Sequence, residues 1–349
     1  MSEARIKTVA RGEGDQRLDR WLKRLLPQLP QSRIERLCRR GEVRLNGRRV
    51  KPSVRLEEGQ EVRMPPIISN RQPEKRQLSI PISEIAKIKA SVIHIDDQII
   101  ALNKPPGLAV QGGSRQTLHL DGLLPHLQFG LEETPRLVHR LDKETSGVLL
   151  LARSRAIAAA LTAEFRHRET KKIYWALVDG VPKPASGRIQ YGLVSRLRSK
   201  GGGQMICTID PQEVPKTEGA RNADTLYYTV AHTIENIVWL ALQPKTGRKH
   251  QLRVHLSAIG HPILGDSKYG IGNRDRPKEQ LEILRDKVSL DQLHLHARSL
   301  QIKHPVTRQE LLLCADLPVH MRSALTNLGC DLEKVPSAPF GPLPNGRVQ

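Results

Sequence analysis

The stretch His139-Arg140-Leu141-Asp142-Lys143-Glu144-Thr145-Ser146-Gly147 is followed at once by the apolar run Val148-Leu149-Leu150-Leu151-Ala152. This run is short and has no polar face, so it predicts a fully buried strand. Polar residues at the start of such a strand lie on a loop that the strand holds rigid, where catalytic groups are often placed. A plain structural alternative is an Asx turn formed by Asp142 before the strand begins.

The size and charge of the chain limit the classes of partner. A chain of 349 residues is long enough for about two domains. Its 56 Lys and Arg against 36 Asp and Glu give a formal charge of +20, which indicates a polyanionic partner. The sequence has no apolar stretch of about 18 residues, so nucleic acid is favoured over a membrane. Aromatic residues make up only 3%, which favours recognition by shape and charge over base stacking.

Cofactor and compartment signals are few. The four cysteines have no metal-ligand spacing, which is typical of a reduced cytoplasmic protein, and the N-terminus lacks the apolar core of a signal peptide. His250, His255 and His261 do not fall at the i, i+4 spacing of a helical zinc site. No phosphate-binding glycine loop or nucleophile elbow occurs. We therefore expect no metal and no cofactor.

The N-terminal region predicts two helices and a hairpin. Apolar residues at i, i+3, i+4 and i+7 from Leu18 predict the first helix, and a second is expected from Ser32 to Gly41. Asn46-Gly47 between alternating residues predicts a tight hairpin. The basic residues predicted here to contact nucleic-acid phosphates are Arg33, Arg36, Arg40, Arg44, Arg48 and Lys51. A solvated helix face is the alternative interpretation of the arginines.

The remaining segments follow from local pattern. Polar, proline-interrupted residues 67–90 predict a linker. Beyond it we expect a hairpin from residue 92, helices at 156–165 and 249–259, a strand at 170–178, and a hairpin with a mobile basic tip within 181–224. The expected organisation is an extension 1–13, a first domain 14–66, the linker 67–90, a second domain 91–330 and a disordered tail 331–349.

The signature His139-Arg140-Leu141-Asp142 with Thr145-Ser146-Gly147 resembles the central loop of the RluA family of RNA pseudouridine synthases. Three further segments resemble that family in the same order, namely NKPPGLAV at 103–110, the K-x-Y strand ending at Gly180, and TGRKHQLRVHL at 246–256. The first domain resembles the S4 RNA-binding domain. The resemblance implies an α+β fold, with a helix-helix-hairpin S4 domain before a mixed, mostly antiparallel catalytic sheet.

The resemblance also implies roles for individual residues. Asp142 takes the position of the essential carboxylate, Arg253 that of its ion-pair partner, and Tyr174 that of the tyrosine beside uracil. Arg140 would enter the space left by the flipped base, and His250 would contact the substrate. Without the family, Tyr174 would be interpreted as a strand aromatic that fills the core. The arginine has a physical reason, because burial alone raises a carboxyl pKa and a guanidinium opposes that shift.

The reaction that the family implies detaches uracil from ribose and reattaches it through carbon, without redox change and so without a cofactor. The target base must leave the stack to react. The chain most resembles the enzymes that modify large-subunit (23S) ribosomal RNA. Among them, the type that modifies more than one uridine is the first choice, and the type that acts on a different stem-loop is the second. Another ribosomal or transfer RNA site, a non-catalytic ribosome-assembly protein and a DNA binder are the alternatives. We expect a monomer.

Overall fold

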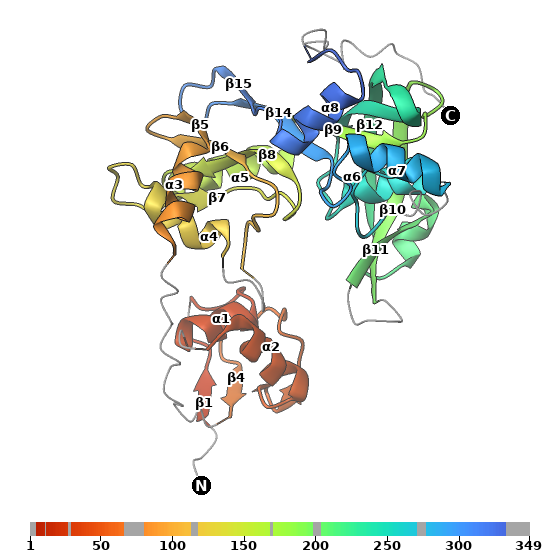
Figure 1. Cartoon of the computed structure of the whole chain (residues 1–349). Helices are drawn as coiled ribbons and strands as arrows, with labels where there is room; N and C mark the ends of the chain where they lie inside the picture. Colours follow the sequence, from red (N-terminus) through yellow and green to blue (C-terminus); the bar gives the residue numbers. More distant parts are fainter. Residues whose placement is uncertain are drawn as a thin grey trace. The chain divides into compact units, whose positions relative to one another are not determined.

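The computed structural model describes residues 5–10, 12–26, 29–65, 80–112, 118–167, 170–197, 204–270 and 277–332 (Figure 1). The chain forms two compact units, residues 1–79 and 80–349. Each unit has its own hydrophobic core. No helix in the described ranges is long and apolar enough to cross a membrane.

The first unit packs two helices on a small sheet, as predicted. Helix α1 (Leu18–Leu25) buries Trp21, and α2 (Gln31–Arg40) ends at Gly41, whose φ of 72° is the left-handed cap that glycine favours. Asn46 and Gly47 both have positive φ, as a tight hairpin turn requires. The strands, in the order β1-β4-β2-β3, are β1 (Arg5–Thr8), β2 (Arg44–Leu45), β3 (Arg48–Arg49) and β4 (Glu61–Met64).

The predicted boundaries of this unit need two corrections. Residues 1–13 are not a plain extension, because β1 pairs antiparallel with β4 and Val9 is buried in the core. Ile6 is the one apolar residue among the four of β1, so the strand has no hydrophobic alternation to detect. The linker prediction is wrong for residues 82–90, which form helix α3 (Ile82–Ala90). Pro81, which suggested a break, occupies the N-cap position of that helix. Residues 66–79 lie outside the described ranges.

The second unit is built on one large mixed sheet. Among the described residues, eleven strands belong to it, in the order β11-β10-β12-β13-β9-β14-β8-β6-β5, with β15 paired to β14 and β7 to β8. Among the strand pairs of the described ranges, only β14–β8 is parallel, so the predicted mixed, mostly antiparallel sheet is confirmed. The strands are β5 (Val92–Ile95), β6 (Ile99–Lys104), β7 (Arg136–Leu137), β8 (Ser146–Ala152), β9 (Lys171–Asp179), β10 (Ser186–Leu197), β11 (Gln204–Ile209), β12 (Arg221–His232), β13 (Ile237–Pro244), β14 (Leu295–Lys303) and β15 (Glu310–Cys314).

Helices cover both faces of the β5–β8 half of the sheet. Every residue of β8 is buried, which confirms the prediction from its apolar run. Leu149 and Leu151 face a cluster that includes side chains of α3, α4 (Leu120–Leu123) and the 3-10 helix η1 (Leu124–Leu127). Val148 and Leu150 face the opposite cluster, which includes α5 (Arg155–His167). The strand that carries the signature loop is therefore fixed from both sides.

The β9–β13 half is covered in the same way (Figure 1). Val238 and Leu240 of β13 pack in one cluster with α6 (Gln251–Ala258), close to the expected helix 249–259. Trp239 and Ala241 face the other cluster, with α7 (Lys278–Lys287) and α8 (Val319–Asn327). The short 3-10 helices η2 (Pro211–Lys216) and η3 (Ile234–Asn236) lie in the connections. The predicted basic hairpin tip around 198–203 and the tail from 333 lie outside the described ranges.

Candidate active site

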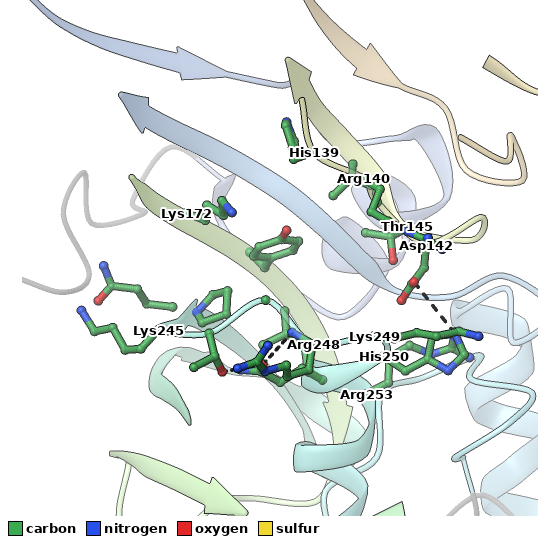
Figure 2. Close-up of a pocket in the computed structure, with 18 of the residues that line it drawn as sticks. His139, Arg140, Asp142, Thr145, Lys172, Lys245, Arg248, Lys249, His250 and Arg253 are labelled. Carbon is green, nitrogen blue, oxygen red and sulfur yellow. Dashed lines mark hydrogen bonds and ion pairs between the residues drawn. The ribbon is translucent and has the colours of Figure 1, made fainter. Parts of the chain in front are cut away.

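The signature loop opens onto a groove of about 980 Å³. It is lined by residues 139–142 and Thr145 of the signature loop, the start of β9, the end of β13 and the segment 245–253. These pieces are far apart in sequence and meet because β9 and β13 are neighbours and β14 lies between β9 and β8. Figure 2 shows the side chains of Asp142 and His250 facing one another across this groove.

Asp142 is held by its backbone and not by its carboxylate. The Thr145 N–H donates to the backbone oxygen of Asp142 at 3.1 Å. Among the described residues the carboxylate accepts no hydrogen bond, so the Asx-turn interpretation is wrong. The side chain is 22% exposed, and the polar side chain that approaches it is His250, with 3.9 Å between Asp142 Oδ1 and His250 Nε2. The carboxylate is thus free to meet a substrate.

Gly147 allows β8 to run directly against β14. Its φ is 109°, and a Cβ there would collide with the backbone oxygen and carbonyl carbon of Ala297, which it pairs with across the parallel ladder. Beside it, the Ser146 hydroxyl and His296 Nδ1 lie 2.9 Å apart. The Ser-Gly part of the signature therefore fixes the pairing of β8 with β14 directly after the signature loop.

The NKPPGLAV segment braces the loop through a buried lysine. Lys104 has 0% exposure, and its Nζ donates to the backbone oxygens of Pro105, Leu108 and Lys143 at 2.7–3.1 Å. The Gly107 N–H also donates to the Lys143 oxygen. Burial lowers the pKa of Lys104 to about 7, against the raising effect of the Glu144 and Asp142 charges. The sequence predicted a rigid bend here but not this lysine.

Tyr174 lines the same groove as Asp142, as predicted. Burial raises the pKa of its phenol well above the usual range, and the Asp142 charge raises it further. The hydroxyl therefore stays protonated at neutral pH. A neutral aromatic ring beside a carboxylate can stack on a nucleobase and donate a proton, but a phenolate base is disfavoured.

The expected ion pair between Arg253 and Asp142 is not what the structure contains. Arg253 Nε and one terminal nitrogen donate to the two carboxylate oxygens of Asp266 at 2.7 and 2.6 Å, and these side chains are 4% and 0% exposed. A planar guanidinium forms its best pair with one carboxylate held in the same plane, and Asp266 supplies it. Burial alone lowers the Arg253 pKa, but the bonds and charge of Asp266, followed by the charge of Asp142, raise it. Arg253 lines the groove without contacting Asp142 directly.

A line of cations along the groove could not be predicted from spacing. Lys172 lies over the Phe165 ring at 4.5 Å, and burial lowers its pKa to about 8. Figure 2 shows Lys172 and Lys245 on the side of the groove away from Asp142. Arg140 is exposed. The Lys and Arg residues that line the groove are Arg140, Lys171, Lys172, Arg188, Lys245, Arg248, Lys249 and Arg253.

The basic residues predicted on the first unit are all exposed. Arg44 is tied by its guanidinium to the backbone oxygens of Gly41 and Gly47. Arg40 lies 3.9 Å from Glu42. Within the described part of the chain, Arg33, Arg36, Arg48 and Lys51 form no ion pair. Unpaired cations of this kind are available to phosphate.

Among the described residues, the histidines of the segment 250–261 are not grouped with other possible metal ligands. The described residues contain no group of three or more His, Cys, Asp or Glu side chains that could hold a metal ion. His255 is fully buried, and burial lowers its pKa to about 4. His250 has an αL backbone with φ of 55° and its ring is bonded to Tyr269. The density of histidines in this segment therefore reflects core packing and one site residue.

Comparison with known proteins agrees with this geometry. Residues 98–258 match the RNA pseudouridylate synthase family, and residues 16–62 match the S4 domain. The chain is 34% identical over 320 residues to the ribosomal large subunit pseudouridine synthase C of Vibrio cholerae, covering 90% of this chain and 93% of that protein. The chain belongs to the RNA pseudouridine synthase family. It is an enzyme of that family with an S4 domain at its N-terminus, which confirms both predicted resemblances.

Other members extend the comparison. The Escherichia coli ribosomal large subunit pseudouridine synthase C is 33% identical over 329 residues, covering 93% of this chain and 96% of that protein. The solved structure of human RNA pseudouridylate synthase domain containing 4 is 33% identical, with a TM-score of 0.58, and covers 70% of this chain and 95% of that one. The family match at residues 98–258 contains every residue that lines the groove except Leu295, so the groove lies in the region shared with the family.

Proposed function

We propose that this pseudouridine synthase isomerises specific uridines of large-subunit (23S) ribosomal RNA, with Asp142 as the essential carboxylate. The observation that carries the proposal is an unbonded carboxylate that faces a groove lined by eight cations and by the half-buried Tyr174. A flipped uridine brings its phosphates with it, and the lysines and arginines offer charge to them. The relatives' printed names support the ribosomal RNA target.

In this proposal Tyr174, Arg140 and Arg253 each have a separate role, and the first unit binds the RNA. The Tyr174 ring stacks on the uracil, and its neutral phenol can return a proton at the end of the reaction. Arg140, exposed on the catalytic loop, fills the space that the flipped base leaves. Arg253 stabilises the negative charge of Asp142 across the groove while bonded to Asp266. The first unit holds the RNA through Arg33, Arg36, Arg40, Arg44, Arg48 and Lys51.

We also propose that the enzyme acts as a monomer in the cytoplasm. All described residues of the groove come from one chain, between His139 and Leu295. The compartment follows from the proposed substrate, because the relatives with this printed name are bacterial proteins.

Asp142→Asn is the decisive test, because it removes the charge and leaves the shape of the side chain. We expect the variant to bind an unmodified large-subunit RNA transcript as the natural protein does and to form no pseudouridine, measured by chemical mapping. Glu144→Gln is the matched control, since Glu144 lies on the same loop but does not line the groove. Activity of Asp142→Asn within tenfold of the natural protein would exclude Asp142 as the catalytic group.

The RNA target is tested separately by mapping pseudouridines in ribosomal RNA from cells that lack the protein. Loss of pseudouridine at several large-subunit positions is the expected result. Loss confined to another stem-loop or to transfer RNA would place the enzyme in a different subgroup. An unchanged map together with intact RNA binding would instead indicate an assembly factor.

A further inference from the structure

The His250 ring lies between the catalytic carboxylate and a buried tyrosine. Its Nε2 is 3.9 Å from Asp142 Oδ1, and its Nδ1 is 2.8 Å from the Tyr269 hydroxyl. The His250 residue is 8% exposed and Tyr269 2%. Figure 2 shows the dashed line that joins Asp142 to His250. The imidazole therefore has one nitrogen for each neighbour.

The Tyr269 hydroxyl decides which nitrogen carries the hydrogen. The backbone N–H of Ile206 on β11 points at the Tyr269 oxygen at 3.2 Å, and a backbone N–H can only donate. The tyrosine O–H hydrogen then needs an acceptor, and His250 Nδ1 is the one that the described residues offer. An imidazole that accepts at Nδ1 carries its hydrogen on Nε2, which is the nitrogen that faces Asp142.

Burial keeps this imidazole neutral. Burial lowers the pKa of His250 to about 4. The Asp142 charge opposes this effect, while Arg253, Lys268 and Lys249 add to it. A neutral donor can orient a carboxylate without cancelling its charge, whereas a cationic histidine would form an ion pair with it.

We propose that His250 is a positioning residue for Asp142, a neutral Nε2–H donor whose tautomer is fixed by Tyr269. The distance of 3.9 Å is too long for a hydrogen bond, and it shortens to one when RNA fills the groove, as catalytic contacts often do on substrate binding. Tyr269 accepts a hydrogen bond from Ile206 on β11, which pairs with β10. A movement of the β10–β11 hairpin would therefore change the orientation of Asp142 through Tyr269 and His250. The inference rests on the proposed catalytic role of Asp142.

The tautomer is tested directly by ¹⁵N NMR of the full-length protein labelled at histidine. The signals of His250 are those that disappear in His250→Gln. We expect an unprotonated Nδ1 and a protonated Nε2 in the natural protein, and a mixture of tautomers in Tyr269→Phe. Tyr227→Phe is the matched control, because its buried hydroxyl donates to the Pro184 oxygen and it does not line the groove. A hydrogen on Nδ1 in the natural protein would overturn the proposal, whatever the activity.

Activity separates positioning from packing. A glutamine amide nitrogen can take the place of Nε2, whereas an asparagine amide nitrogen takes the place of Nδ1. We expect kcat to fall more in His250→Asn than in His250→Gln, by about tenfold to a hundredfold, the value of a hydrogen bond to a charged group. KM for RNA should change little in either variant. Equal losses in kcat, or losses confined to KM, would contradict a positioning role.

The two proposals fail in different ways. Activity of Asp142→Asn would reject the catalytic role of Asp142, whereas the tautomer of His250 measured by NMR would not be affected by that result. An inactive Asp142→Asn together with equal activity of the two His250 variants would retain Asp142 and reject His250. If Tyr269→Phe does not fold, the spectrum of the natural protein and the glutamine–asparagine comparison still decide the question.

Discussion

Replacing Asp266 with asparagine should strongly destabilise the second unit (residues 80–349, here called the catalytic unit), because it leaves the buried Arg253 guanidinium without its counter-charge. Arg253 and Asp266 are 4% and 0% exposed and share two hydrogen bonds. Removing one partner of such a buried pair costs about 3–5 kcal/mol at neutral pH. Asparagine still offers an oxygen to the N–H groups of Lys268 and Tyr269, so the lost charge is the main change.

The more exposed Arg188–Asp224 pair is the matched control. It has the same two-bond geometry at 3.0 and 2.6 Å, but its side chains are 53% and 17% exposed. Exposed pairs contribute about 0–1 kcal/mol. Asp224→Asn should therefore be nearly neutral for stability. The double variant Arg253→Met with Asp266→Asn should be more stable than Asp266→Asn alone, because no unpaired charge remains buried.

The pH dependence of the loss has a definite sign. Burial alone raises the pKa of Asp266, but the bonds and charge of Arg253 and the two backbone donors outweigh it, so the folded pKa lies below 3.8. A lowered carboxyl pKa contributes stability that is present above the unfolded value and is lost as the pH falls through the folded value. The difference between the natural protein and Asp266→Asn should be constant near neutral pH and shrink below about pH 4.

Urea unfolding followed by tryptophan fluorescence measures this difference. Trp175 and Trp239 lie in the catalytic unit, and a Trp21→Phe background removes the signal of the first unit. A loss below 1 kcal/mol, no larger than that of Asp224→Asn, would refute the assignment of Asp266 as the partner of Arg253. So would a loss that stays the same from neutral pH to pH 3.

Three further outcomes are expected. Gly147→Ala should lower the free energy of unfolding by about 3 kcal/mol or more, because a Cβ would collide with the Ala297 backbone. Gly130→Ala is the control, since it has a positive φ but no atom near the added Cβ. Equal unfolding midpoints for the two variants would contradict the strand contact. RNA affinity should fall as the pH rises through about 8, where Lys172 loses its proton, and Lys172→Arg should flatten the fall, as binding titrations would show. Raising salt from about 50 to 200 mM should cost about 10³ in affinity if about six phosphates are contacted, and a flat response would count against an electrostatic interface.

The parts of the fold with a strong local pattern could be predicted from the sequence. The apolar run at 148–152 became β8, the Asn46-Gly47 pair became a hairpin turn, and Gly41 ended α2. Strand β1 and helix α3 were missed. The first is short and pairs with a distant strand, and the second begins directly after a proline, so neither had a clear local signal.

The sequence predicted which residues lie in the site but not all of the contacts between them. The motifs brought Asp142, Tyr174, His250 and Arg253 together in one groove, as expected. A motif states that residues share a site, but it does not say which of two carboxylates a guanidinium faces. The cations Lys172, Lys245 and Arg248 converge because β9 and β13 are antiparallel neighbours, and that neighbourhood is a property of the sheet order.

The corrected pairing of Arg253 bears on how Asp142 would act in the proposed reaction. A guanidinium that donated two hydrogen bonds to the Asp142 carboxylate would orient that carboxylate. It would also cover both carboxylate oxygens and neutralise their charge. Here Asp266 satisfies the guanidinium, and the two form a buried pair with no net charge. Asp142 then faces the neutral imidazole of His250 and shares the groove with the neutral phenol of Tyr174, and the groove is also lined by cations. An anion without a contact ion pair keeps both oxygens available for a substrate that the basic groove has already drawn in.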